Sequence, residues 1–229
     1  MKILKNAGRF EILTPVEELK RQLLAIEIAG RTCYQSEKGE ITPETAASFV
    51  KKRLKSGHES VIEHTSMTVK FLDCSRGFTH ELVRHRLAAF SQESTRYVDE
   101  SNASFVVPPH KDENEPITLD DGREVSLAQM LVETERFYRG LRKAGWAPED
   151  ARQILPTAIE AEIVVTANFR EWRHIFEMRT QKAAHWEIRA VMCKLLARAQ
   201  EFVPVVFDDF EFGGEDKNGV SYYKKVALE

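Results

Sequence analysis

The chain has 229 residues and a mass of 26.3 kDa, with 42% apolar and 30% charged residues. This predicts a single globular domain over residues 1–229 with a sizeable core. The 33 basic and 36 acidic residues give a net charge of −3. That balance excludes bulk, charge-driven binding of nucleic acid but allows a local basic pocket for a phosphorylated ligand.

Targeting and redox signals favour a cytoplasmic protein. No apolar run approaches the roughly 18 residues of a membrane span, and the first residues do not have the pattern of a signal peptide. Cys33, Cys74 and Cys193 are far apart and form no CxxC pair. We therefore expect free thiols, no structural metal site and no membrane partner.

The first half of the chain predicts helices interrupted by short strands. Helical spacing and capping residues predict helices from residues 14–17 to about Arg31, and from Thr42 to a stop at Gly57. Residues 10–13 predict an edge strand, and the alternation in residues 65–72 predicts a half-buried strand. Ser75 is expected to cap a helix that continues through Arg86.

The second half predicts one excursion and then mainly helices. Residues 108–122 contain prolines and acidic residues and predict a loop or small hairpin. A capping box at residues 126–129 predicts a helix that ends before Gly145, with Leu131, Phe137 and Leu141 facing inward. Further helices are predicted at about 149–155, 157–167, 169–180 and 185–202, with a polar tail from Phe207 that wraps or frays. The fold class is α+β.

The densest polar constellation lies at residues 84–97, where three arginines and a histidine alternate with hydroxyls and an amide. Arginine presents a planar fork that binds phosphate oxygens bidentately. Serine and glutamine add neutral donors for a sugar or base. A nucleotide pocket accounts for this composition; the alternative is a solvated charged surface.

The spacing of this segment resembles the signature of the flavin-dependent thymidylate synthases, Arg-His-Arg, seven residues, then Ser. Arg84, His85, Arg86 and Ser94 fill those positions, while Ala89 stands where many members have serine. Further matches are residues 57–64, 81–83, 168–170, His174, Arg179 and 185–187, so the resemblance covers roughly residues 10–205.

The resemblance implies a helix-flanked antiparallel sheet, assembled as a homotetramer whose sites are shared between subunits. It implies reductive methylation of dUMP to dTMP by a methyltransferase. The carbon donor would be 5,10-methylenetetrahydrofolate, reduced FAD the hydride donor and NADPH the reductant. The expected partners are these small molecules and further copies of the chain, with no nucleic acid.

The resemblance also assigns residues to roles. The cofactor would bind Ser66, Arg84, His85, Arg86, Gln92, Asn168, Phe169, Arg170 and His174. The substrate would bind Glu81, Leu82, Val83, Arg84, Gln92, Glu93, Ser94, Thr95, Arg96, Arg152 and Arg179. Arg179 is the expected catalytic residue, because its positive charge would stabilise negative charge on the uracil ring.

Several alternatives remain open from the residues alone. Ser94 is a candidate nucleophile, but its arginine-rich surroundings favour a donor to the nucleotide. His64 either contacts a ligand or is a hydrogen-bonded structural histidine. A different class of protein would use Arg84, Arg86 and Arg96 to bind RNA phosphates. Another would use His58, Glu59 and His64 in a metal-dependent hydrolase, although their spacing does not match a zincin.

Overall fold

The computed structural model describes residues 1–5, 8–33, 35–36 and 39–227. It contains both helices and strands, in agreement with the predicted α+β class. The strands form a four-stranded sheet of order β2-β3-β8-β4 and three two-stranded pairs. The chain divides into two compact units, and the single-domain organisation stays a prediction.

The strands and helices have the following bounds. The strands are β1 (Lys2–Leu4), β2 (Arg9–Ile12), β3 (Met67–Ser75), β4 (Ala88–Gln92), β5 (Ser104–Val106), β6 (Ile117–Thr118), β7 (Glu124–Val125), β8 (Glu160–Ala167), β9 (Phe210–Glu215) and β10 (Ser221–Lys225). The helices are α1 (Val16–Cys33), α2 (Pro43–Lys55), η1 (Glu59–Glu63), α3 (Arg76–Leu82), α4 (Leu127–Lys143), α5 (Pro148–Ala151), η2 (Arg152–Ile154), α6 (Phe169–Arg179), α7 (Trp186–Phe202) and α8 (Pro204–Phe207).

One unit comprises residues 1–9, 71–82 and 91–163. Its core gathers Ala103, Phe105, Val107, Leu131 and Ile159, and the β1–β5 pair is parallel. The capping box at Ser126 and Gln129 opens α4, as predicted. The excursion predicted at residues 108–122 contains β6, and the antiparallel hairpin β6–β7 extends three residues beyond it to Val125.

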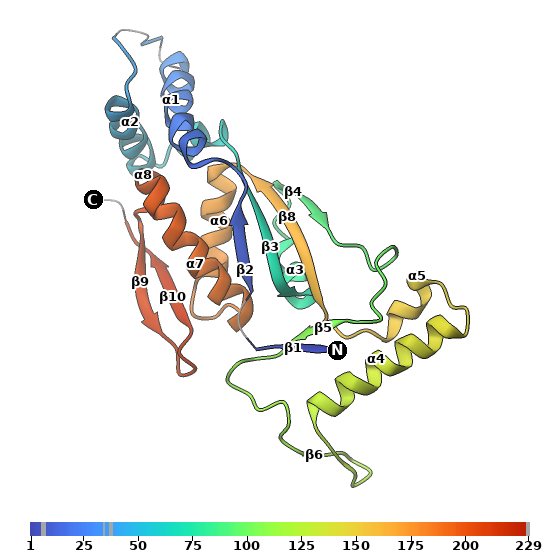
Figure 1. The fold of residues 1–229 in the computed structure, drawn as a ribbon. Helices are drawn as coiled ribbons and strands as arrows, with labels where there is room; N and C mark the ends of the chain where they lie inside the picture. The colour runs from blue at the N-terminus through green and yellow to red at the C-terminus, as the bar shows by residue number, and fades with distance from the viewer. Residues whose placement is uncertain (6–7, 34, 37–38, 228–229) are drawn as a thin grey trace. The chain divides into compact units, whose positions relative to one another are not determined.

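The other unit comprises residues 10–70, 83–90 and 164–229. Helices α1 and α2 pack together, α6 packs on α7, and α7 also packs on the antiparallel hairpin β9–β10 (Figure 1). Trp172 and Phe176 on α6 are fully buried, and the indole N–H of Trp172 donates to the Met67 carbonyl at 2.9 Å. This contact fixes α6 on the start of β3.

Predicted starts and stops of the first helices are largely confirmed. Thr42 caps α2, and Gly57 after its end has the positive φ of +72° that stops a helix. Helix α1 begins at Val16, one residue after the predicted start, and the Thr14 hydroxyl accepts the Thr68 amide at 2.9 Å. The edge strand β2 and the strand β3 lie where alternation predicted them.

The structure corrects four predictions. Residues 160–167 form strand β8 instead of a helix, because Ile163, Val164, Val165 and Thr166 are β-branched and burial alternates along them. Helix α3 ends at Leu82, so the Arg-His-Arg segment lies in a turn.

The other two corrections concern α4 and the tail. Phe137 on α4 is 58% exposed, and Tyr138 takes the inward position. The tail forms the hairpin β9–β10 and does not fray.

Two further findings concern the predicted cellular context. Cys33, Cys74 and Cys193 are free thiols, as expected. Over the residues that the structure describes, no helix combines the length and apolarity that crossing a membrane requires.

Candidate active site

His85 is the central residue of the Arg-His-Arg segment. It is 5% exposed, whereas Arg84 and Arg86 on either side are exposed. The Arg179 Nε donates to His85 Nε2 at 3.0 Å. On the other side of the ring, His85 Nδ1 lies 3.6 Å from a Glu171 carboxylate oxygen. The turn therefore buries the histidine and leaves both arginines available to a ligand.

The surroundings of His85 keep its imidazole neutral. Burial first, and then the charges of Arg179 and His174, lower the pKa of His85 to about 4. The rings of His85 and His174 meet edge-on with centroids 5.3 Å apart. Burial also raises the pKa of Glu171, an effect that the charge of His174 opposes. At neutral pH, His85 therefore accepts a hydrogen bond from the catalytic candidate Arg179.

Helix α6 supplies most of this group because its sequence sets its start and its buried face. The Asn168 side chain caps the helix by accepting the Glu171 amide at 2.8 Å. Phe169 is fully buried against Phe207, so its side chain is part of the core. Arg179 ends the helix, where a cation is stabilised by the helix dipole.

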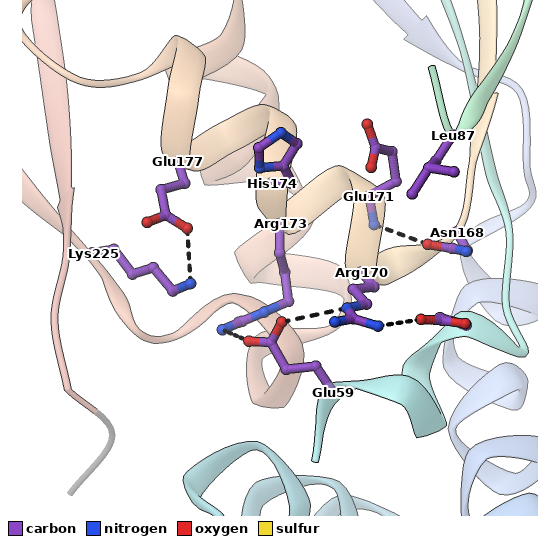
Figure 2. A pocket seen from close by; sticks show the side chains of 10 residues that line it. Glu59, Leu87, Asn168, Arg170, Glu171, Arg173, His174, Glu177 and Lys225 are labelled. Atoms are coloured by element: carbon purple, nitrogen blue, oxygen red, sulfur yellow. Dashed lines mark hydrogen bonds and ion pairs between the residues drawn. The ribbon is translucent and has the colours of Figure 1, made fainter. Parts of the chain in front are cut away.

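A pocket of about 560 Å³ lies along α6. Its lining comprises Glu59, Glu63, Leu87, Asn168, Arg170, Glu171, Arg173, His174, Glu177 and Lys225 (Figure 2). Asn168, Arg170 and His174 were predicted from the sequence to hold the cofactor. The volume falls within the usual range of ligand pockets.

Cations at this pocket are paired with carboxylates. Arg170 pairs with Glu63 and lies 3.9 Å from Glu59, and Lys225 donates to Glu177 at 2.8 Å. Arg173 donates to Glu59 at 3.3 Å (Figure 2). Sequence reasoning missed Lys225, because the tail was predicted to be irregular, and it missed Glu177, whose partner Lys225 lies 48 positions away.

A second polar group gathers the predicted substrate residues of the other compact unit. Arg152 donates to the Thr95 hydroxyl at 3.1 Å, and Arg96 pairs with Glu149 at 3.0 Å. Gln92 donates to the Thr79 hydroxyl at 2.8 Å. The structure thus brings Arg96 and Arg152, 56 positions apart in sequence, to one place. Sequence reasoning missed Glu149. The available signal was its position as an acidic residue in the first turn of α5.

The remaining predicted residues have diverse surroundings. Ser94 accepts the Arg96 amide at 3.3 Å, and the Glu93 carbonyl accepts from Arg76 at 2.8 Å. Leu82 is fully buried, so its side chain packs in the core, while Glu81 is half-buried and Val83 exposed. Ser66 is exposed, and Gln22 holds its backbone through two hydrogen bonds.

In the hydrolase alternative, Glu59 would work with His58 and His64 at a metal ion. In the structure, the Glu59 carboxylate instead contacts the guanidinium groups of Arg170 and Arg173. Among the described residues, the group of potential metal ligands is His85, Glu171 and His174, whose ligand atoms lie within 4.8 Å of one another. His58 and His64 are exposed at either end of η1.

The fold and the two polar groups define an α+β protein with two clusters of arginine and carboxylate side chains. The family described as "thymidylate synthase complementing protein" matches residues 16–205. A flavin-dependent thymidylate synthase of Mycobacterium avium is 38% identical over 197 residues, covering 81% of this chain and 78% of the relative. The Mycolicibacterium gilvum enzyme of the same name is 40% identical, with the same coverage.

A solved structure shows the same fold. The UMP/dUMP methylase PolB from Streptomyces cacaoi, bound with 5-Br dUMP, superposes with a TM-score of 0.72 at 22% identity. The match covers 91% of this chain and 96% of that one. The chain belongs to the flavin-dependent thymidylate synthase family.

Proposed function

We propose that this protein catalyses the reductive methylation of dUMP at C5 to give dTMP, as a methyltransferase of its family. The carbon comes from 5,10-methylenetetrahydrofolate. Bound FAD, reduced by NADPH, supplies the hydride. The observation that carries the proposal is the hydrogen bond from Arg179 to a neutral His85 inside the Arg-His-Arg signature.

The pocket along α6 fits part of a flavin dinucleotide. Arg170 and Lys225 offer charges to a diphosphate, and the apolar Leu87, 77% exposed, offers a surface to an aromatic ring. Asn168 and His174 add polar contacts. We assign FAD binding to these residues together with Ser66, the exposed Arg84 and Arg86, and Gln92.

Arg96 and Arg152 are the proposed ligands of the dUMP phosphate. Their guanidinium groups are tied to Glu149 and Thr95, which limits their rotation before substrate arrives. Gln92 and Ser94 offer neutral donors to the sugar or base. In this proposal the two arginines bind the charged phosphate, whereas Gln92 and Ser94 contact the neutral atoms of the sugar or base.

Arg179 supplies the electrostatic contribution to catalysis. Its guanidinium cannot lose its proton, and its charge favours loss of the uracil N3 proton. The resulting negative charge spreads over the ring carbonyls and polarises the C5–C6 bond. The carbon can then be transferred without an enzyme nucleophile, which leaves Ser94 as a donor to the nucleotide.

We further propose a cytoplasmic homotetramer with shared sites. The free thiols suit a reducing compartment. Exposed apolar side chains on α4, including Met130 and Phe137, lie beside Ile154 and suit burial between subunits.

The test is the visible spectrum of the purified protein after FAD is added and excess removed, followed by an assay of dTMP from dUMP. A retained flavin band and folate-dependent dTMP formation are expected. Absence of both, with nucleic-acid affinity that falls steeply with salt, would establish the RNA-binding alternative.

A further inference from the structure

Glu171, His85 and Arg179 form a chain of a carboxylate, an imidazole and a guanidinium. Glu171 and Arg179 both belong to α6, two turns apart, and His85 comes from the turn after α3. The Arg179 Nε donates to His85 Nε2 at 3.0 Å, and His85 Nδ1 lies 3.6 Å from Glu171. Glu171 and His85 are each about 5% exposed.

The first of these contacts fixes the position of the imidazole proton. The Arg179 Nε always carries hydrogen, so His85 Nε2 must be the acceptor. A neutral imidazole has one N–H, which must then lie on Nδ1, the nitrogen that faces Glu171. If His85 were protonated, its Nε2–H would point at the Arg179 N–H, and two hydrogen-bond donors would face each other.

We propose that Glu171 is a positioning residue, which holds His85 in the Nδ1–H tautomer and thereby orients the guanidinium of Arg179. This rests on the proposed function insofar as Arg179 acts on the substrate. The logic is that of a buried carboxylate that sets the tautomer of a neighbouring histidine. Glu171 acts through His85 and need not touch substrate.

The same geometry opposes a metal ion at this cluster, although three ligand atoms lie within 4.8 Å. A cation bound to His85 Nδ1 would place the imidazole proton on Nε2. That N–H would then face the Arg179 N–H at 3.0 Å. Because Nε2 accepts the hydrogen bond from Arg179, Nδ1 has to carry the imidazole proton and is not free to bind a cation.

The first test is the tautomer itself, which requires neither flavin nor turnover. Nitrogen-15 NMR of the full-length, histidine-labelled protein at neutral pH should show His85 protonated on Nδ1 and bare on Nε2. The resonance is assigned by its absence in His85→Gln. An Nε2–H tautomer in the wild type would overturn the proposal.

The second test separates positioning from pocket lining. In Glu171→Leu we expect kcat for dTMP to fall about 10-fold or more while KM for dUMP and FAD affinity hold. The matched Glu171→Gln retains a side-chain oxygen that can accept from Nδ1–H and should recover most of kcat.

Three results would overturn the positioning role in this second test. The first is a loss of FAD affinity that matches the loss of kcat. The second is a Glu171→Gln variant no better than Glu171→Leu, provided that both are folded. The third is an unchanged kcat in Glu171→Leu.

Failure of the proposed function gives a different pattern. If Arg179→Ala turns over normally, the role of Arg179 is wrong whatever the NMR shows. If Glu171→Leu does not fold, the wild-type tautomer and Glu171→Gln still decide the proposal.

Discussion

Arg179 is the residue on which the proposed chemistry depends most directly. Its removal takes away the charge opposite the uracil ring, so Arg179→Ala should lower turnover by about 10²–10³-fold while FAD stays bound. Steady-state kinetics and flavin absorbance measure the two effects. Arg198→Ala is the control, because Arg198 is an exposed arginine on α7 that pairs with Glu201. Normal turnover in Arg179→Ala would remove the residue from the mechanism.

Ser94 should contribute binding and not covalent chemistry. Its hydroxyl accepts the Arg96 amide at 3.3 Å, so the residue shapes the loop that carries Arg96, the proposed phosphate ligand. Ser94→Ala should raise KM for dUMP and keep measurable activity. Complete loss of turnover with intact dUMP binding would instead support a nucleophilic serine.

Glu100 gives the fold a pH dependence. Its side chain is 7% exposed, and its Oε1 has no hydrogen-bond partner among the described residues. Burial first, and then the charge of Glu93, raise the pKa of Glu100 to about 7. The folded state thus binds a proton that the unfolded state releases near pH 4.5, so stability falls as the pH rises from about 4.5 to 7.

Replacing Glu100 by glutamine should remove this loss of stability. We expect Glu100→Gln to exceed the wild type by about 3 kcal/mol at pH 8 and to match it at pH 4.5. Urea unfolding at the two pH values measures the difference. Equal stability of the two proteins at pH 8 would show that Glu100 ionises in the folded state at little cost.

At the scale of elements, a buried ion pair fixes α6 to the segment after α8. Arg173 binds Asp209 bidentately with both contacts at 2.6 Å, and each side chain is about 3% exposed. Asp209→Asn removes the buried counter-charge of this guanidinium and leaves only the more exposed Glu59 beside it, so it should cost about 3 kcal/mol of unfolding free energy. The neighbouring exposed Asp208→Asn is the control. Similar melting temperatures for the two variants would contradict this.

The helices and strands that the sequence predicts correctly are those whose signals lie within a few residues of one another. The caps of α2 and α4 lie within four residues, so the sequence alone located both helices. Strand β8 was predicted as a helix, because a short apolar run is ambiguous until its neighbours are known. Its β-branched residues were the available signal. The hairpin β9–β10 depends on packing against α7, which no local pattern encodes.

The same difference between local and distant signals applies to the residues of the candidate site. The Arg-His-Arg signature is contiguous, so residues 84–96 could be predicted as site residues from the sequence, and the resemblance added Arg179. Their partners were not, because Glu149 and Glu171 meet Arg96 and His85 across 53 and 86 positions. Contacts at such separations exist only after the chain has folded. Carboxylates that neutralise or orient an arginine therefore have to come from the structure.

At the scale of the whole molecule, the proposed shared sites predict an assembly. Light scattering should give a mass near four times 26.3 kDa. Phe137 on α4 is 58% exposed, so Phe137→Glu should dissociate the assembly and lower activity and FAD binding together. Leu13→Glu, at a residue 48% exposed, is the control. A monomeric wild type that is fully active would contradict shared sites.

The ion pairs along α6 have a consequence for how the pocket fills. Arg170 and Lys225 already have carboxylate partners, so an entering diphosphate has to displace Glu63 or Glu177. Binding is then an exchange of one anion for another, with little release of bulk ions and weak sensitivity to salt. Inorganic phosphate offers fewer contacts to compensate for the broken pairs, so we expect it to bind this pocket more weakly than a dinucleotide does.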